Sequence, residues 1–204
     1  MTPKLVAEFF AGIGLVRMAL ERAGWAVRLA NDIDEKKAQL YRANFPGVDF
    51  RLGDIREIQA DDVPDVQLAT ASFPCIDLSL AGNRDGLSGQ HSSAYWEFHR
   101  IVEAMGERRP KLVLLENVLG LLSSSGGNDL RSIVASLNKM GYVCDLLAVD
   151  AVHFVPQSRP RLFVIGVQGR EVTGPLAHGA RPAPVLGFMQ AHSALKWSRA
   201  VLPP

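Results

Sequence analysis

The sequence predicts an α/β protein whose doubly wound sheet is mostly parallel. Apolar runs of strand length alternate with segments whose apolar residues recur at helical spacing, and this alternation continues as far as residue 168. The run Lys111–Leu115 is continuously apolar after its first residue, as in strands that are buried on both faces of a parallel sheet. Glycines punctuate the pattern at Gly12, where a strand turns into a helix, and at Gly24, where that helix ends.

The elements follow one another in a regular order. The first strand, Lys4–Phe10, is followed by a helix with Leu15, Met18, Ala19 and Ala23 on one face. The further expected strands are Val27–Ala30, Val48–Leu52, Val66–Ser72, Lys111–Leu115, Val143–Val149 and Arg161–Val167. The further expected helices are marked by Ala38, Tyr41 and Phe45, by Tyr95, Phe98, Val102 and Met105, and by Leu130, Ile133, Val134 and Leu137 after an Asp129 cap and before Gly141.

Composition restricts the class of protein. With 204 residues, 48% of them hydrophobic and 21% charged, the chain is suited to one soluble domain, residues 1–168, and residues 169–204 read as a linker rich in Pro and Gly. No apolar stretch approaches the roughly 20 residues of a membrane span, and no signal peptide is expected. Two cysteines form neither a disulfide framework nor a metal cluster, which favours the reducing cytoplasm. The net charge of +1 alone does not indicate a nucleic-acid partner.

Glycines and acids follow the first three strands. Gly12 and Gly14 follow the first strand, where the missing Cβ atoms let a ligand approach the backbone. Asp32 stands 20 residues after Gly12 at the end of the second strand, where an acid accepts hydrogen bonds from ribose hydroxyls, and Asp54 ends the third. We expect a nucleoside-bearing cofactor, although a purely structural glycine turn stays open. The segment after Gly14 departs from the dinucleotide fingerprint, which disfavours a dehydrogenase.

Cys75 is the candidate nucleophile. It follows the fourth strand in Phe73-Pro74-Cys75, at the carboxyl edge where open α/β sheets place their sites. A single cysteine is commonly a small buried hydrophobe, and Cys144, inside an apolar strand, fits that description. Cys75 instead opens a polar, glycine-containing segment.

Charged residues also occupy two later strand ends. Glu116 ends an apolar strand, where an unpaired carboxylate is costly to bury, so a partner or a role is expected. Arg159 and Arg161 stand at the start of the last strand, and in an extended segment they point the same way. A structural ion pair between Glu116 and Arg161 is the alternative.

Together these residues resemble the motifs of the DNA (cytosine-5-)-methyltransferase family. The resemblance covers Phe9–Gly14, Phe73–Ser79, Glu116–Val118 and Gln157–Arg161, in the family's order and with compatible spacing. It implies a Rossmann-like fold of the S-adenosylmethionine-dependent methyltransferase type. It also implies methyl transfer to carbon 5 of a cytosine flipped out of double-stranded DNA, with S-adenosylhomocysteine as the product, in bacterial restriction–modification.

The resemblance assigns chemical roles. Cys75 adds to carbon 6 of the cytosine after activation by a cation such as Arg159. Glu116 contacts ring nitrogen 3 and the exocyclic amine, and apolar surroundings would keep it protonated so that it can donate. Arg161 holds the exocyclic oxygen. Contacts with DNA are expected from Ser79, which reaches a target-strand phosphate, and from Arg84, in a loop that closes over DNA.

The implied cofactor is S-adenosylmethionine, and no metal is needed. The family positions match residues of this sequence at several strand ends, although Ile33 occupies a place that often holds a bulkier group. The expected lining is Phe10, Gly12, Ile13 and Gly14 for the amino-acid and ribose side, Asp32 and Ile33 for the ribose and adenine, Asp54 and Ile55 for the adenine, with Pro74 and Tyr95 completing the pocket.

Members of the family normally continue with a target-recognition region and two closing motifs, which this sequence does not contain. We expect a split enzyme whose second polypeptide carries them, because every catalytic residue is present. The alternatives are an inactive truncated fragment, a non-catalytic module that binds a partner or DNA, and a tRNA cytosine-5 methyltransferase. The segment Asp77-Leu78-Ser79 favours DNA over tRNA. The recognised DNA sequence depends on base contacts in the missing region.

Overall fold

A computed structural model describes residues 4–74, 94–169 and 181–198. The chain divides into two compact units, the first of residues 1–73 and 92–114 and the second of residues 74–91 and 115–204. Cys75, Ser79 and Arg84 lie outside the described residues. All seven expected strands are present, and the largest difference in their bounds is that β5 runs three residues further, to Val118.

The first unit contains a parallel sheet with the strand order β3-β2-β1-β4. β1 (Leu5–Phe9) pairs in parallel with β2 (Ala26–Asp32) and with β4 (Leu68–Ala71), and β2 pairs in parallel with β3 (Asp49–Leu52). The carboxyl ends of these strands therefore lie at one edge of the sheet. The helices of this unit are α1 (Leu15–Arg22), α2 (Glu35–Asn44) and α3 (Ala94–Ala104), with 3₁₀ turns at Ile55–Glu57, Ala60–Asp62 and Gly106–Arg108.

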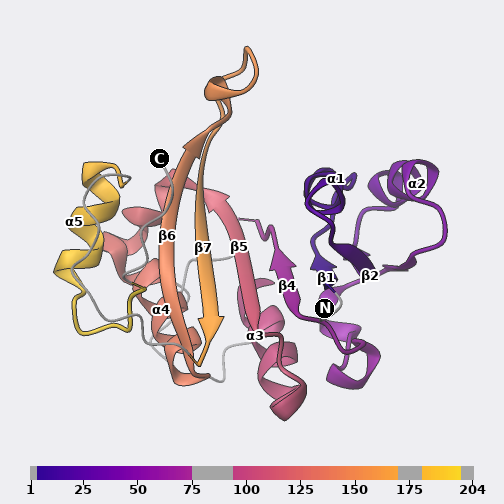
Figure 1. The fold of residues 1–204 in the computed structure, drawn as a ribbon, viewed down its shortest axis with the longest axis horizontal. Coiled ribbons are helices and arrows are strands. Elements are labelled where there is room, and N and C mark those ends of the chain that lie inside the picture. The colour runs from indigo at the N-terminus through magenta and orange to yellow at the C-terminus, as the bar shows by residue number, and fades with distance from the viewer. Residues whose placement is uncertain (1–3, 75–93, 170–180, 199–204) are drawn as a thin grey trace. The chain divides into compact units, whose positions relative to one another are not determined.

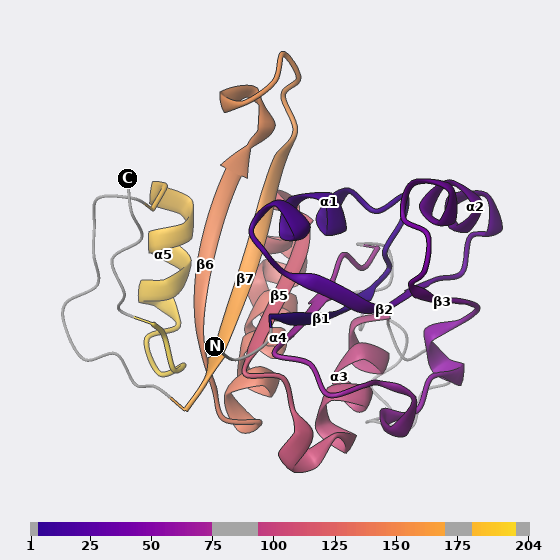
Figure 2. The same cartoon turned by 45° about the vertical axis from the view of Figure 1, so that its right-hand side comes forward.

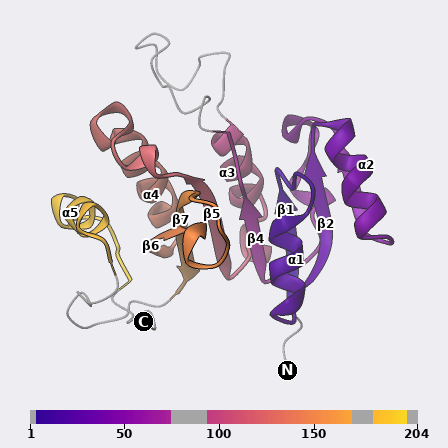
Figure 3. The same cartoon turned by 90° about the horizontal axis from the view of Figure 1, so that it is seen from above.

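Alternate side chains of β1 meet helices on opposite faces of this sheet. Glu8 accepts a hydrogen bond from the Tyr41 hydroxyl of α2 at 2.7 Å. The ring of the next residue, Phe9, meets Phe98 of α3 edge-on, with ring centroids 5.5 Å apart. Figure 3 likewise shows α1 and α3 on opposite sides of β1. The predicted doubly wound arrangement is confirmed in this unit.

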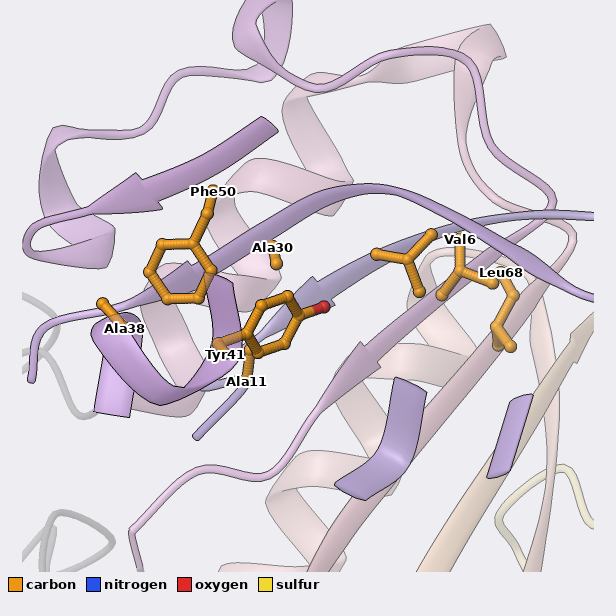
Figure 4. Packing of buried hydrophobic residues seen from close by; sticks show 8 residues of the cluster. Val6, Ala11, Ala30, Ala38, Tyr41, Phe50 and Leu68 are labelled. Atoms are coloured by element: carbon orange, nitrogen blue, oxygen red, sulfur yellow. The ribbon is translucent and has the colours of Figure 1, made fainter. Parts of the chain in front are cut away.

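Small and aromatic side chains share the core beneath α2. Asp34 caps this helix by accepting a hydrogen bond from the Lys36 N–H at 2.9 Å. Figure 4 shows the ring of Tyr41 reaching from α2 into the core beside Phe50, and their ring centroids lie 4.8 Å apart. The alanines in the cluster leave room for these rings. Its buried members are Val6, Ala11, Val27, Ala30, Ala38, Tyr41, Phe50 and Leu68.

The predicted apolar face of α1 does not face the core. Leu15 and Met18 are 63% and 42% exposed, whereas Arg17 is buried. The guanidinium carbon of Arg17 lies 4.6 Å from the ring centroid of Phe45 and 5.6 Å from that of Tyr41. Apolar spacing identified the helix but not its buried side, because an arginine that packs on aromatic rings buries as well as an aliphatic residue does.

The second unit is built on a long antiparallel hairpin. β6 (Tyr142–Asp150) and β7 (Pro160–Gln168) pair along their whole length, and the strand order is β5-β7-β6 (Figure 1). The boundary between the units falls within β5 (Leu112–Val118). The 3₁₀ turns of this unit are Leu119–Leu122, Ser124–Gly127 and Ala151–His153.

Helix α4 (Asn128–Lys139) has the buried face that its sequence predicts. Its buried apolar residues are Leu130, Ile133, Val134 and Leu137. The predicted Asp129 cap is wrong, because Gly127 in the left-handed conformation (φ 87°) occupies the N-cap. Asp129 lies inside the first turn, is buried, and accepts hydrogen bonds from the hydroxyls of Ser124 and Ser125.

The segment that the sequence predicts as a linker contains a helix, α5 (Ala183–Ala191), which runs alongside β6 (Figure 2). Beyond it, the main chain at Trp197 forms a parallel bridge with Cys144 of β6. Within the described residues, no helix is long and apolar enough to cross a membrane.

Candidate active site

The glycine turn after β1 has the backbone geometry of a loop that a ligand approaches closely. Gly12 and Gly14 have positive φ of 57° and 90°, and Phe10 also has a positive φ, of 55°. A side chain in the left-handed region costs about 1–2 kcal/mol per residue, which accounts for the glycines. Strain of the kind that Phe10 carries clusters at functional sites. The predicted cofactor residues Phe10, Gly12 and Gly14 therefore lie in one specialised turn.

Asp32 is bonded directly to this turn. Its Oδ2 accepts a hydrogen bond from the Gly12 N–H at 2.8 Å, and its Oδ1 accepts one from the Asp34 N–H at 2.9 Å. The Ala11 N–H donates to the Asn31 carbonyl at 2.9 Å, which adds a second tie between the ends of β1 and β2. A carboxylate oxygen accepts two hydrogen bonds, so each Asp32 oxygen keeps capacity for a further donor such as a ribose hydroxyl.

A cavity of about 170 Å³ lies at the end of β3. Asp54 lines it and is held by Arg56, whose Nη2 lies 2.5 Å from the Asp54 Oδ2. The Arg56 side chain keeps the pKa of Asp54 below its ordinary value, so this acid is an acceptor. Ligand pockets usually measure about 300–1,000 Å³, so the cavity accommodates only one portion of a nucleoside. It is lined by Asn31, Arg51, Leu52, Gly53, Asp54, Glu57 and Ile58.

The other expected cofactor residues differ in exposure. Ile13 and Ile33 are 42% and 68% exposed, so both present apolar surface near the glycine turn and the end of β2. Ile55 is buried, and Tyr95 is fully buried against Phe73, with ring centroids 5.5 Å apart. Pro74 is exposed. Their contact with a cofactor stays a prediction.

Glu116 and Arg161 form an ion pair in the second unit. The Arg161 Nε lies 2.7 Å from the Glu116 Oε1, and the side chains are 20% and 24% exposed. The Arg161 Nη1 donates to the Pro160 carbonyl at 2.8 Å, which fixes the guanidinium on β7. The sequence predicted apolar surroundings for Glu116, but the structure sets a cation against it. The pair offers a carboxylate and a guanidinium side by side, a combination that recognises a planar group with both donors and acceptors.

Arg159 is exposed, and its backbone N–H donates to the Asp150 Oδ1 at 2.6 Å. The proposed pairing of Arg159 with the Cys75 thiol falls partly outside the described residues and stays a prediction. Within the described residues, no group of three His, Cys, Asp or Glu side chains is arranged to hold a metal ion.

Of the two cysteines, the structure describes Cys144, whereas Cys75 lies outside the described residues. Cys144 is fully buried in β6, and burial raises the pKa of its thiol to about 12. A thiol of that pKa is not a nucleophile near neutral pH. The sequence-based assignment of Cys144 to the core is confirmed.

Three buried polar residues of the first unit, Glu8, Arg17 and Tyr41, were not identified from the sequence as functional. Glu8 is 1% exposed and bonds Tyr41, which lies under Arg17. The available signal was an acid inside the otherwise apolar run Lys4–Phe10, which requires a buried partner.

A comparison with protein families identifies residues 5–185 with the family described as C-5 cytosine-specific DNA methylase. Curated relatives include the type II methyltransferases M.DsaV of Dactylococcopsis salina and M.BanI of Aneurinibacillus aneurinilyticus. The first is 33% identical over 80% of this chain and 45% of its own length, and the second is 34% identical over 79% and 38%. The chain thus spans less than half the length of these relatives.

Solved structures give the same picture of the fold. Dnmt2 methyltransferase of S. pombe has a TM-score of 0.68 at 24% identity, covering 83% of this chain and 52% of that one. The methyltransferase EhMeth of Entamoeba histolytica also has a TM-score of 0.68, at 20% identity, over 90% and 58% of the two chains. The predicted Rossmann-like α/β fold is confirmed. Because the family match covers most of the sequence, the chain belongs to the C-5 cytosine-specific DNA methylase family.

Proposed function

We propose that this chain supplies the reaction centre of a DNA (cytosine-5-)-methyltransferase, acting on a flipped cytosine in double-stranded DNA with S-adenosylmethionine as methyl donor. The observation that carries the proposal is the Glu116–Arg161 pair, 2.7 Å apart, in a chain of this family. An acid and a guanidinium side by side match the amine, ring nitrogen and carbonyl edge of cytosine. The glycine turn bonded to Asp32 supports the assignment of the cofactor.

The reaction requires electrons to be pushed into the cytosine ring, because carbon 5 is a poor nucleophile. The Cys75 thiolate adds to carbon 6, and Glu116 delivers a proton to ring nitrogen 3 so that charge does not accumulate there. Arg161 holds the exocyclic oxygen and stabilises the charge that develops on it. Carbon 5 of the resulting enamine then attacks an electrophilic methyl group. Loss of the carbon 5 proton to a base, return of the ring nitrogen 3 proton to Glu116 and departure of the thiolate restore the aromatic ring.

The first unit would hold the methyl donor. S-adenosylmethionine, when bound, supplies a methyl group on a sulfonium centre. Asp32 would accept hydrogen bonds from the ribose hydroxyls, and the left-handed turn at Gly12 and Gly14 would let the backbone approach the amino-acid end. Asp54, held as a carboxylate by Arg56, would accept from the adenine amine at the small cavity.

We further propose that a second polypeptide supplies target recognition and the rest of the cofactor pocket, and that the enzyme works in the bacterial cytoplasm. The two named relatives are more than twice as long as the part that matches this chain. The competing functions are an inactive fragment, a non-catalytic binding module, and methylation of tRNA cytosine.

A methyl-transfer assay tests the proposal. Labelled S-adenosylmethionine is incubated with DNA or tRNA and with this chain, alone or together with the product of the neighbouring reading frame. We expect label in DNA with the second polypeptide present, and none with Cys75→Ser. Cys144→Ser is the matched control, since the buried thiol has no role in transfer. Label in tRNA alone would favour the RNA reaction, and no label in either nucleic acid, from folded protein, would contradict the proposal.

A covalent trap tests the role of Cys75 separately. DNA with fluorine in place of hydrogen at carbon 5 of the target cytosine cannot lose a proton there, so the adduct persists after methylation. We expect a complex of chain and DNA that survives denaturation. Cys75→Ser should abolish it, whereas a binding module would show no covalent complex with either form.

A further inference from the structure

A buried polar cluster lies beneath the glycine turn of the first unit. Glu8 of β1 is 1% exposed, and its Oε2 accepts a hydrogen bond from the Tyr41 hydroxyl at 2.7 Å. Arg17 of α1 is buried over the rings of Tyr41 and Phe45. Its Nε is bonded to Glu21 at 2.7 Å. The strand and both helices that frame the turn therefore meet at these side chains.

The aromatic part of this cluster touches the turn itself. A Cβ atom at Gly14 would lie 2.4 Å from the Phe45 Cε2 and 3.1 Å from the Tyr41 Cδ2. These rings thus occupy the space directly under the Gly14 backbone. Figure 4 shows Tyr41 together with Ala11, a residue of the same turn, in one cluster of buried side chains. Because interiors are close-packed, a shift of the Tyr41 ring moves the support of Gly14 and of its neighbour Gly12, which bonds Asp32.

The cluster is not optimised for stability. In the described part of the chain, the Glu8 Oε1 and the Arg17 Nη1 are buried without a hydrogen-bond partner. A buried unpaired polar atom is destabilising, and such an exception calls for an explanation. A role in function accounts for a costly group more directly than a role in folding does.

We propose that Glu8, acting through Tyr41 and Arg17, is a positioning residue that sets the glycine turn for the cofactor. The proposal rests on the proposed function, in which this turn holds S-adenosylmethionine. When protonated, Glu8 is buried without a charge and stays hydrogen-bonded to Tyr41, so β1 and α2 are held together beneath the turn. When ionised, it is a carboxylate that burial disfavours, so the cluster opens toward water and the rings under Gly14 loosen.

The charge of Glu8 changes in the neutral range. Burial raises the pKa of Glu8 to about 7. The hydroxyl of Tyr41, the backbone N–H of Arg17 and the charge of Arg17 only partly offset this effect, and the charge of Glu21 adds to it. Cofactor affinity should therefore be high below this pH and lower above it. Glu8→Gln keeps the shape and an acceptor but removes the charge, so it mimics the low-pH form at every pH.

The test is the affinity of the complete chain, with its second polypeptide, for S-adenosylmethionine at pH 6 and pH 8. For the wild type we expect binding about tenfold weaker at pH 8, the effect of one poorly compensated buried charge beneath the turn. Glu8→Gln should bind at both values as the wild type does at pH 6, whereas Tyr41→Phe, which removes the donor to Glu8, should bind more weakly than the wild type at pH 6. Tyr142→Phe, which alters another fully buried tyrosine in the second unit, should keep the wild-type pH profile.

Amide hydrogen exchange gives a readout that needs no cofactor. At pH 8, the N–H groups of Gly12 and Gly14, which donate to Asp32 and to the Ala11 carbonyl, should exchange more slowly in Glu8→Gln than in the wild type. Unchanged exchange and an unchanged pH profile of affinity would overturn the positioning role and leave the proposed function intact. If the folded wild type binds no S-adenosylmethionine, the proposed cofactor is wrong, and the exchange result alone decides whether Glu8 sets the turn.

Discussion

Each unit of the molecule buries a carboxylate, and the two are compensated differently. Glu8 in the first unit is 1% exposed, and the hydroxyl of Tyr41, a neutral group, donates to it at 2.7 Å. Asp145 in the second unit is 4% exposed, and the Nη2 of Arg181 lies 2.7 Å from its Oδ1 and 2.6 Å from its Oδ2. A tyrosine hydroxyl gives a buried acid one neutral hydrogen-bond donor, whereas a guanidinium gives it several donors and an opposite charge. The first arrangement leaves the charge of the acid uncompensated by its donor, and the second forms a buried ion pair that joins two segments of the chain.

The ion pair of Arg181 and Asp145 helps to hold the segment from Arg181 to Ser198. The backbone N–H of Cys144 donates to the Lys196 carbonyl at 3.0 Å, and that of Ser198 donates to the Cys144 carbonyl at 2.6 Å. Asn138 of α4 bonds the backbone of Lys196 with both ends of its side-chain amide. This part of the chain is thus bound to β6 and α4 of the second unit by one buried ion pair and a short set of main-chain bonds.

Arg181→Met should have the largest effect on stability, because it removes the partner of Asp145 and leaves a carboxylate buried and unpaired. We expect a loss of about 3–5 kcal/mol in the free energy of unfolding. Urea unfolding followed by tryptophan fluorescence measures it, since Trp197 is buried in the docked segment. Replacing both partners, with Asp145→Leu added, should recover most of the loss. A single variant as stable as the wild type would show that the pair of Arg181 and Asp145 does not stabilise the fold.

Gly14→Ala should disturb the packing of the cluster around Glu8, because the added methyl group lies against the rings of Phe45 and Tyr41. The added methyl group meets the Phe45 ring at 2.4 Å in a backbone with φ of 90°, so overpacking adds to the conformational cost, giving about 2–5 kcal/mol in all. Gly12→Ala is the matched control, because φ is 57° there and no atom lies within 4 Å of the new Cβ. Its expected cost is about 1–2 kcal/mol. Equal losses of stability for Gly14→Ala and Gly12→Ala in thermal unfolding would mean that the rings of Phe45 and Tyr41 move aside for the added methyl group without an energetic cost.

The contrast explains what could be read from the sequence. Strands and helices were predictable because buried apolar runs such as Lys111–Leu115 report directly on local structure. The partners of buried charges were not, because Arg181 lies 36 residues from Asp145 and Tyr41 lies 33 from Glu8. The predicted linker failed to suggest α5 because its Pro and Gly content outweighed a short apolar stretch that is helical only when docked.

The residues of the candidate site can likewise be divided into those that spacing along the sequence predicts and those that it does not. Gly12 and Asp32 were predictable because backbone chemistry at strand ends follows from sequence spacing, and their 2.8 Å hydrogen bond joins two residues 20 positions apart. The partner of Glu116 was foreseen as an alternative, since two charges at neighbouring strand ends tend to pair. The burial of Arg17 in place of Leu15 was not foreseen, because the hydrophobic pattern of a helix does not register stacking of a cation on rings.

Glu8→Gln sharpens the comparison by removing the titration without a change in shape. Because folding raises the pKa of Glu8 from 4.5 to about 7, its contribution to stability is full below pH 4.5 and is lost as the pH rises to about 7. Each pKa unit corresponds to about 1.4 kcal/mol, so the variant should match the wild type in acid and exceed it by about 3 kcal/mol at pH 8. Unfolding in urea across pH 5–8 measures the difference. A variant that is less stable than the wild type at pH 8 would mean that the charge of Glu8 stabilises the fold.

A third acid completes the series, since Glu116 faces a guanidinium as Asp145 does but remains 24% exposed. Water screens such a pair, so Glu116→Gln should alter the free energy of unfolding by less than about 1 kcal/mol. If Glu116 delivers the proton to cytosine, methyl transfer should nevertheless fall by about 10²–10⁴-fold. Asp65→Asn, which disrupts an ion pair with Arg108 of 3.2 Å in the first unit, is the control and should leave transfer unchanged. Glu116→Gln could instead lose much stability while transfer falls only in proportion to the unfolded protein. That result would mean that Glu116 and Arg161 form a structural ion pair, as Asp145 and Arg181 do, with no role in catalysis.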